Sequence, residues 1–436
     1  MSSTREVREE DSDTDPPISA RRTFLISGIG TALEYYDFLI YGLSAALVFN
    51  TVFFPSADPL LGTLLAFAAF GTGFIARPLG GIVIGHLGDR HGRRKMLVFT
   101  LIAMGVSTIL IGCLPGYDTI GVWAPIALVA LRLMQGFASG GEWGGAALLG
   151  LESSPPDRRG LWGSFTSMGV GLGGGIGILV FAAVSAIFGD ALVDWAWRIP
   201  FLIGGVLVIV GLVARLSMPE ETLTENAGGR PPIVRALQRS PRTVLLTLGI
   251  SYGYNTIAYI GTSFFLAYLT QLGVPPTRAL LISATTAATI VVAAPLAALL
   301  SDRFGRKPVM AGGGVLMAAF LFLFFWGVQR EAILLSVVLF AVTGLVMGCI
   351  QGPLPAFLGE QFPASMRYSG ISFSYQIGAA IGGGTATFIA TGLLILTDRN
   401  PYSVALYGAA AMVVLVICVL SLKETSNLTT EQINAE

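Results

Sequence analysis

Apolar residues fill most of this chain in long runs, and polar residues gather in the short segments between them. A bilayer core needs about 20 apolar residues per helix, so each long run predicts a transmembrane helix. Twelve such runs lie at 23–49, 61–88, 95–114, 121–151, 160–188, 197–217, 243–270, 277–301, 308–328, 332–361, 368–396 and 402–422. The expected fold class is therefore an all-α integral membrane protein with 12 transmembrane helices.

Composition supports a membrane protein and argues against other classes. The 436 residues are 53% hydrophobic and 12% charged, whereas an average soluble domain is about a quarter charged. The net charge is zero and the basic residues are dispersed, so no nucleic-acid partner is expected. The chain has no His or Cys set with metal-ligand spacing and no nucleophile with a partnered base, so we expect no metal, no cofactor and no enzymatic activity.

The distribution of positive charge predicts the orientation in the membrane. Cytoplasmic loops carry the excess of Lys and Arg in membrane proteins. Twenty of the 26 basic residues lie in the tails and in the loops after even-numbered helices, and four lie in the other loops. Both termini are therefore expected in the cytoplasm, with the chain in the inner (plasma) membrane. The acidic stretch 1–22 is expected to be a disordered tail, and 423–436 a short second tail.

Several segments occur twice in the chain. GHLGDRHGRRKM (85–96), after the second predicted helix, returns as ALLSDRFGRKPVM (298–310), after the eighth. The exits of the fourth and tenth helices, LGLESSPPDRRG (149–160) and FLGEQFPASMRYSG (357–370), are also alike. The chain therefore duplicates itself.

The duplication predicts two pseudo-symmetric six-helix bundles, at 23–217 and 243–422, joined by a cytoplasmic linker at 218–242. Transporters built from two such halves hold the substrate between them, near the bilayer midplane. Alternating access is the function that this organisation suggests.

The repeated loops also predict a latch between helices. An Asp at the cytoplasmic face can approach the N-terminus of a neighbouring helix while arginines pair with carboxylates or carbonyls, and such contacts can hold one conformation and break in another. The alternative is that the basic residues only determine topology. The candidate latch and gating residues are Asp89, Arg90, Arg93, Arg94, Glu142, Glu152, Arg159, Asp302, Arg303, Arg306, Glu360 and Arg367.

Few charged residues lie inside the predicted helices. An ionised side chain at mid-bilayer costs about 2.5–3.5 kcal/mol on insertion scales, so each one is a functional candidate. Glu34 and Asp37 share one face of the first helix, roughly 16 to 21 Å from its start at 1.5 Å per residue, which is near the midplane. Arg77 lies in the second helix and Arg132 in the fourth.

We interpret Arg132 as the partner of Asp37 or Glu34. Two close carboxylates beside one arginine do not easily both stay ionised, so one of them should bind a proton near neutral pH. Protonation then frees the guanidinium for a substrate carboxylate. The alternative is a purely structural ion pair between the first and fourth helices. Which carboxylate carries the proton is left open by the sequence.

The second half supplies uncharged polar groups at helical spacing, which suit a hydroxylated ligand and equally suit ties between helices. The candidate substrate-binding residues of both halves are Tyr41, Arg77, Arg132, Gln135, Tyr252, Asn255, Tyr259, Gln351, Tyr375 and Gln376.

These motifs resemble one transporter family over essentially the whole chain. GDRHGRRKM and SDRFGRKPVM resemble the paired signature of the major facilitator superfamily. EYYDFLIYG, RPLGG and RLMQGFASGGEWGGAALL resemble the metabolite:proton symporter family within it, and YGLSAALVFNTVFFP and FGTGFIARPLGG resemble its shikimate-type members. The segment after the twelfth helix is too short for the coiled coil of the osmosensing proline and betaine members, because a coiled coil needs about three to four heptads.

The resemblance implies a proton-coupled symporter that takes up a small organic acid, such as a shikimate-like hydroxylated monocarboxylate or another carboxylate. A proton symporter for a zwitterion such as proline or betaine is the alternative within the family. A non-coupled channel or receptor-like membrane protein is the alternative from another class. The expected partners are a small-molecule substrate, a proton and the lipid bilayer, and the chain is expected to act as a monomer.

Overall fold

The computed structural model describes residues 27–55, 58–91, 93–140, 142–216, 237–330, 332–364, 366–426, 428 and 432. Every element assigned within these ranges is a helix. The predicted N-terminal tail, most of the predicted linker and most of the predicted C-terminal tail lie outside the described residues.

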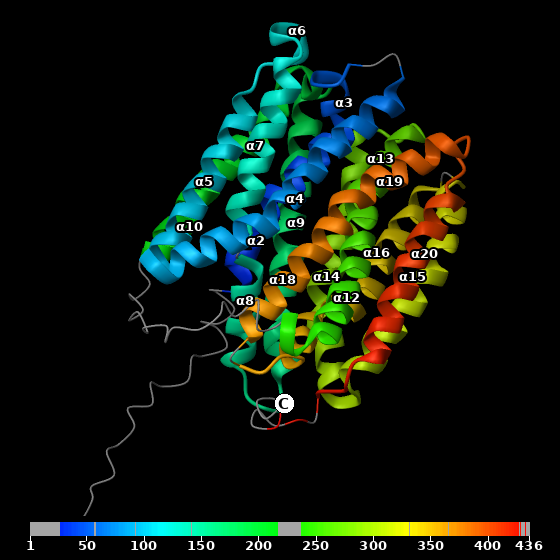
Figure 1. The fold of residues 1–436 in the computed structure, drawn as a ribbon. Helices are drawn as coiled ribbons and strands as arrows, with labels where there is room; N and C mark the ends of the chain where they lie inside the picture. Colours follow the sequence, from blue (N-terminus) through cyan, green and yellow to red (C-terminus); the bar gives the residue numbers. More distant parts are fainter. Residues whose placement is uncertain are drawn as a thin grey trace, which may run out of the picture.

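The helices form an elongated bundle, in which most helices of the first half lie on the left of Figure 1 and most helices of the second half lie on the right. The first half contains α2 (Ile29–Leu47), α3 (Phe49–Val52), α4 (Pro59–His91), α5 (Arg93–Cys113), α6 (Tyr117–Ile120), α7 (Trp123–Ser139), α8 (Glu142–Glu152), α9 (Arg159–Phe188), the π-turn η2 (Leu192–Ala196) and α10 (Arg198–Leu216). The second half contains α12 (Pro241–Tyr259), the π-turn η3 (Ile260–Phe264), α13 (Phe265–Gln271), α14 (Pro276–Phe304), α15 (Arg306–Val328), α16 (Ile333–Gln351), α17 (Leu354–Glu360), α18 (Arg367–Ile381), α19 (Gly383–Leu396) and α20 (Tyr402–Ser421).

Within the described residues, eight helices are long and apolar enough to cross a membrane. They correspond to the second, fifth, sixth and eighth to twelfth helices predicted from the sequence. The other four predicted helices are α2, which carries two carboxylates, α5, and the interrupted pairs α7–α8 and α12–α13. The tenth and eleventh are also interrupted, at Gly352–Pro353 and at Gly382, because proline lacks an N–H and glycine weakens a helix.

Close contacts between small residues bring α4 and α7 together. A Cβ at Gly136 would lie 1.9 Å from Gly73 O, and a Cβ at Gly80 would lie 1.9 Å from Phe137 O. Backbones approach this closely in membrane proteins only where side chains are absent. Gly73 also leaves room for a neighbour, because its Cβ would lie 2.6 Å from Arg132 Nε.

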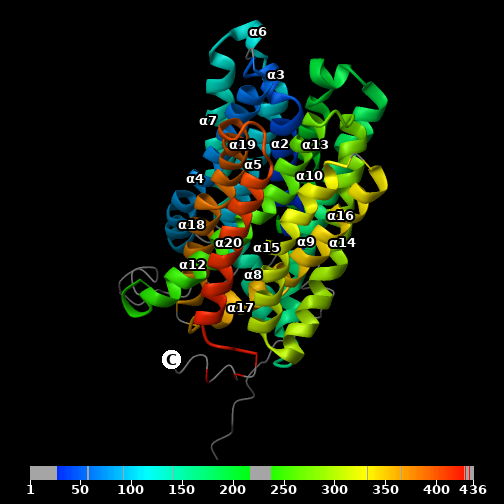
Figure 2. The same ribbon diagram turned by 90° about the vertical axis from the view of Figure 1, so that its right-hand side faces the viewer.

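The two halves contact each other at both ends of the bundle and in the middle. α9 of the first half lies beside α14 of the second (Figure 2). We name the end of the bundle where α9 begins the Asp302 end. Near this end, Ser167 Oγ donates to Gln351 O at 2.6 Å, and at the opposite end the Ser185 and Thr277 hydroxyls are 2.7 Å apart.

Candidate functional site

Glu34 on α2 and Arg77 on α4 form an ion pair in the interior of the first half. Each side chain is only 2% exposed. Of the two carboxylates considered as the partner of Arg132, Glu34 pairs with Arg77 instead. The reason is geometric: the close packing of α2 and α4 puts a second guanidinium beside Glu34, so that each carboxylate has its own arginine nearby.

Arg132 on α7 is completely buried. Its hydrogen-bond partners among the described residues are neutral: Nη1 donates to Gln135 Oε1 at 2.6 Å, and Nε donates to Phe70 O at 3.3 Å. Its Nη2 is buried and has no hydrogen-bond partner in the described part of the chain. A buried cation with a spare donor is suited to receive an anionic group.

Four aromatic rings surround the Arg132 guanidinium. The Cζ atom lies 4.3 Å from the ring centroid of Phe38, 4.4 Å from Tyr41, 4.8 Å from Phe70 and 6.0 Å from Phe74. A desolvated cation–π contact stabilises by about 2 kcal/mol or more. The rings therefore compensate part of the desolvation of this cation.

A chain of hydrogen bonds joins Arg132 to Asp37. Because arginine only donates, Gln135 presents Oε1 to it, so Gln135 Nε2 donates to Thr108 Oγ1 at 2.8 Å. Thr108 then has one proton to donate and two acceptors at 2.9 Å, Asp37 Oδ2 and Met104 O. An ionised Asp37 accepts this proton, whereas a protonated Asp37 can donate to Thr108 and redirect the threonine proton to Met104.

A cavity lies between the halves, and its wall is mostly apolar. Three of the predicted binding residues, Asn255, Tyr259 and Gln351, line it from the second half, and Tyr35 and Phe38 line it from α2. Further polar groups of the second half in the wall are Tyr254, Thr262, Ser283 and Thr286. Among the described residues, this wall offers hydroxyl and amide groups to a ligand and no charged group.

The charged residues of the first half are set back from this cavity, since its lining includes none of Glu34, Asp37, Arg77 and Arg132. Phe38 lines the cavity and contacts both guanidinium groups, at 4.2 Å from Arg77 Cζ and 4.3 Å from Arg132 Cζ. Phe38 therefore covers the arginines on the cavity side.

Three other predicted binding residues, Tyr252, Tyr375 and Gln376, do not line this cavity. The hydroxyls of Tyr375 and Tyr35 are 2.9 Å apart, and Gln376 Nε2 donates to Gly140 O at 2.8 Å. Both contacts tie α18 to the first half. Tyr252 lies where α12 packs closely on α18.

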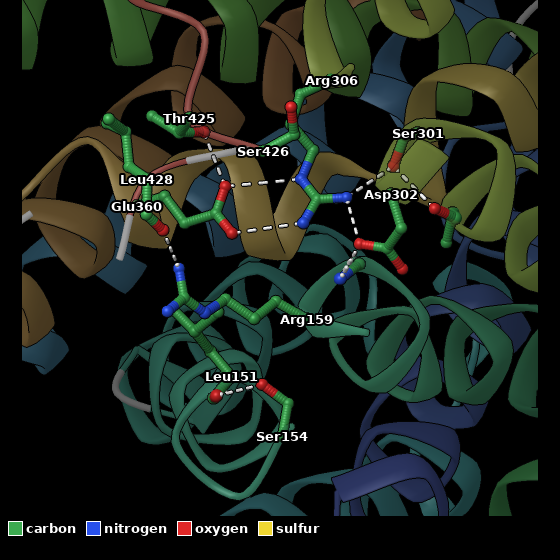
Figure 3. Close-up of polar contacts among 12 residues, drawn as sticks. Leu151, Ser154, Arg159, Ser301, Asp302, Arg306, Glu360, Thr425, Ser426 and Leu428 are labelled. Atoms are coloured by element: carbon green, nitrogen blue, oxygen red, sulfur yellow. Dashed lines mark hydrogen bonds and ion pairs between the residues drawn. The ribbon is translucent and has the colours of Figure 1, made fainter. Parts of the chain in front are cut away.

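At the Asp302 end, one carboxylate joins the two halves (Figure 3). Asp302, near the end of α14, accepts hydrogen bonds from the backbone of α9, from Gly160 N at 2.8 Å and from Leu161 N at 3.0 Å. Arg306 Nη1 also donates to Asp302, at 2.5 Å. An anion at a helix N-terminus is favoured by the helix dipole, so this contact stabilises the approach of α9 to α14.

Arg306 also pairs with Glu360 of α17, through bonds of 3.2 and 3.3 Å (Figure 3). Thr425 Oγ1 donates to the same carboxylate at 2.6 Å. Arg159, at the start of α9, donates from Nη1 to Leu428 O at 2.9 Å. The segment after α20 therefore contacts both halves.

Glu424 caps the N-terminus of α15. Its carboxylate accepts from the backbone N–H groups of Arg306 and Lys307, each at 2.9 Å, and from those of Thr425 and Ser426. Burial alone would raise the pKa of Glu424, but these four donors outweigh it and hold the pKa below its ordinary value.

The remaining latch candidates lie outside these contacts in the part of the chain that the structure describes, or are not described. Glu152 and Arg303 are exposed, and Arg367 Nε donates to Phe362 O at 3.0 Å. The side chains of the other candidates lie outside those that the structure describes: Asp89, Arg90, Arg93, Arg94 and Glu142.

Several residues of this site were not identified from the sequence. Phe38 follows Glu34 by one helical turn, so the helical period places it on the same helix face as the two carboxylates. Its position could therefore have been identified from the sequence. Tyr35 lies within the same motif. Thr108 and Tyr254 carry no such signal, because hydroxyl groups are common in membrane helices as ties.

The fold and the site define a polytopic membrane protein with a cavity between two helical halves, which is the organisation of a secondary transporter. Residues 28–267 match the family described as Major Facilitator Superfamily, and residues 242–436 match the family described as Sugar (and other) transporter. The chain belongs to the major facilitator superfamily. It is a secondary active transporter and not an enzyme.

Relatives of known name cover nearly the full length. The shikimate transporter of Escherichia coli K12 is 40% identical, over 98% of this chain and 99% of that protein. The proline/betaine transporter of the same strain is 33% identical, over 93% and 84%. A solved structure of the proton:xylose symporter XylE has a TM-score of 0.72 at 18% identity, over 95% of this chain and 98% of that chain, and it shares the fold.

Proposed function

We propose that this protein is a proton-coupled symporter that imports a small organic acid, a shikimate-like hydroxylated monocarboxylate, by alternating access. The observation that carries the proposal is the buried Arg132, which has a spare donor at Nη2 among the described residues and is joined to Asp37 through the neutral side chains of Gln135 and Thr108. The named shikimate transporter among the relatives supports the choice of substrate class.

A count of charges explains why proton and substrate bind together. Glu34 and Arg77 cancel each other, which leaves Asp37 and Arg132. When Asp37 is ionised these two also cancel, and the cluster is neutral. When Asp37 binds a proton the cluster carries one positive charge in a low dielectric, and a monocarboxylate at Arg132 neutralises it. Protonation therefore favours anion binding, and the anion favours protonation.

In the second half, Asn255, Tyr259 and Gln351 would hydrogen-bond the hydroxyl groups of the substrate. Direct carboxylate contact is assigned to Arg132. Tyr41 and Gln135 position the guanidinium of Arg132, and Arg77 fixes Glu34. The substrate would then make one charged contact, to Arg132, and several neutral hydrogen bonds. These contacts select for a hydroxylated monocarboxylate.

The proposal includes an orientation in an inner membrane with both termini in the cytoplasm, on the basis of the positive-charge distribution. The Asp302 end then faces the cytoplasm. Two rocking units at 23–217 and 243–422, joined by a linker at 218–242, would open and close this end, with the Asp302 contact as its latch. The protein would function as a monomer in the bilayer.

A zwitterion such as betaine is the second candidate, because three tyrosines, Tyr35, Tyr254 and Tyr259, lie in the cavity wall. Tyrosine rings bind quaternary ammonium groups through cation–π contacts. The proline/betaine transporter among the relatives supports this candidate. A hydroxylated acid and a betaine therefore need to be compared directly.

The test is uptake into proteoliposomes with an imposed inward proton gradient, with labelled shikimate, other hydroxylated acids, dicarboxylates, proline and betaine offered in turn. We expect accumulation of a hydroxylated monocarboxylate, its loss in Arg132→Ala, and loss of gradient-driven accumulation in Asp37→Asn. Undiminished accumulation by Asp37→Asn would contradict the coupling role, and uptake of betaine alone would select the second candidate.

A further inference from the structure

Phe38 occupies a special place among the rings around Arg132. Of the four rings, Phe38 is the one that also lines the central cavity. Its ring centroid lies 4.3 Å from Arg132 Cζ and 4.2 Å from Arg77 Cζ, and the residue is 2% exposed. One ring therefore contacts two guanidinium groups on the side from which a ligand would arrive.

The two arginines differ in what they need from this ring. Arg77 has Glu34 as its ion-pair partner, although its Nε is also buried without a hydrogen-bond partner in the described residues. Arg132 has neutral hydrogen-bond partners and a buried Nη2 without one in the described residues. A ring face attracts a cation through its quadrupole but accepts no normal hydrogen bond, whereas a carboxylate satisfies charge and donors together. A carboxylate is therefore the better partner for Arg132.

We propose that Phe38 is a displaceable aromatic plug. In the empty transporter its ring takes the place of the substrate carboxylate at Arg132 and closes the guanidinium off from the cavity; the substrate carboxylate displaces the ring. This inference rests on the proposed function for the identity of the displacing group. A ligand without a carboxylate has nothing to offer Arg132 in exchange for the ring, so the plug contributes to the selection of acids.

Competition between ring and carboxylate predicts that a weaker plug gives tighter binding. Replacing Phe38 by mono-, di- and trifluorinated phenylalanine keeps the ring nearly the same size while it progressively weakens the cation–π contact. We expect the affinity for shikimate, measured by equilibrium binding to the purified full chain, to rise stepwise along this series. The total gain is up to about thirtyfold, the equivalent of one desolvated cation–π contact.

A flat series would overturn the plug, because the ring would then not compete with the carboxylate. Weakening affinity would also overturn it, since the ring would then be a stabilising part of the binding wall. The proposed function fails if the unmodified protein binds none of shikimate, other hydroxylated acids, dicarboxylates, proline and betaine. A second test, which needs no ligand, then shows separately whether Phe38 covers Arg132.

That test is the reactivity of Arg132 toward phenylglyoxal, an arginine reagent, read by mass spectrometry of the empty protein. We expect Arg132 to be protected in the native chain and in Phe38→Trp, which keeps a ring, and to be modified in Phe38→Ala. Equal modification of the exposed Arg303 in all three, with a monodisperse elution profile, controls for folding. Protection of Arg132 in Phe38→Ala would refute the plug.

Discussion

The contact between Asp302 and the start of α9 yields a quantitative prediction for Asp302→Asn. The native carboxylate accepts from two backbone N–H groups, at 2.8 and 3.0 Å, with one oxygen for each. Asparagine offers one oxygen and one NH2 group, so one of these N–H groups would face a donor. The change keeps the volume of the side chain and removes its charge toward Arg306.

The size of the effect follows from this geometry. A hydrogen bond to a charged group contributes about 1.5–3 kcal/mol, and an anion at a partly buried helix N-terminus contributes up to about 2 kcal/mol. The two figures overlap and do not add. The Asp302 side chain is 9% exposed, so screening by salt is small. A loss of about 2 kcal/mol shifts the balance at this end toward the open conformation roughly thirtyfold.

The measurement is the distance between two spin labels in nanodiscs. Asp157 in the first half and Leu300 in the second are both exposed near this end and accept labels, in a chain whose three cysteines have been replaced. Asp302→Asn should increase the fraction of molecules with a long distance between the two labels. The control Asp190→Asn, which changes an exposed aspartate at the opposite end, should not. An unchanged distance distribution in Asp302→Asn would refute the latch reasoning.

Three further changes test other contacts. Thr108→Val interrupts the chain of hydrogen bonds from Asp37 to Arg132, so gradient-driven accumulation of substrate should fall about tenfold or more. Substrate exchange without a gradient should be largely kept, and the control Thr108→Ser should accumulate substrate at a nearly normal level. Gly136→Ala forces a Cβ to within 1.9 Å of a carbonyl oxygen. Overpacking costs about 1–3 kcal/mol, so the melting temperature of this variant in detergent should fall by several degrees. The control Gly312→Ala places its Cβ in open space and should leave the melting temperature unchanged. Glu424 has a lowered pKa, so its cap on the N-terminus of α15 should be intact above the ordinary pKa of 4.5 and lost as the pH falls through the lower pKa of the folded state. Amide hydrogen exchange near residue 424 should therefore rise in acid. Glu424→Gln should show the same rise already at pH 7.

The broad fold followed from the sequence because its signals are long and repeated. Twelve apolar runs and a duplicated loop define the number of helices and the two halves without any knowledge of packing. The interruptions of the helices are harder to predict, although Gly352 and Pro353 mark one of them. Even the π-turn that follows Tyr259 leaves no mark in the apolar pattern, because hydrophobicity does not depend on the local helical pitch.

The sequence identified the charged candidate residues of the site, but not which of them pair with each other. Charged residues in a membrane helix are conspicuous, so Glu34, Asp37, Arg77 and Arg132 were all identified as candidates. Their partners depend on which helices touch, and that is decided by small-residue contacts such as Gly73 with Gly136, which lie on different helices. Long-range packing of this kind has no local sequence signal.

The separate partners of the two carboxylates also indicate which one carries the proton. Glu34 is in direct contact with Arg77, so Glu34→Gln would leave a buried arginine unpaired, and breaking a buried pair costs about 3–5 kcal/mol. Asp37 receives a hydroxyl proton from Thr108, and Thr108 and Gln135 join it to Arg132, so Asp37→Asn keeps a side chain of the same size that can still hydrogen-bond to Thr108. We therefore expect Glu34→Gln to lower the melting temperature far more than Asp37→Asn, and Asp37→Asn to lose the pH dependence of substrate affinity while it remains folded. Equal melting temperatures, together with pH dependence lost only in Glu34→Gln, would assign the proton to Glu34 instead.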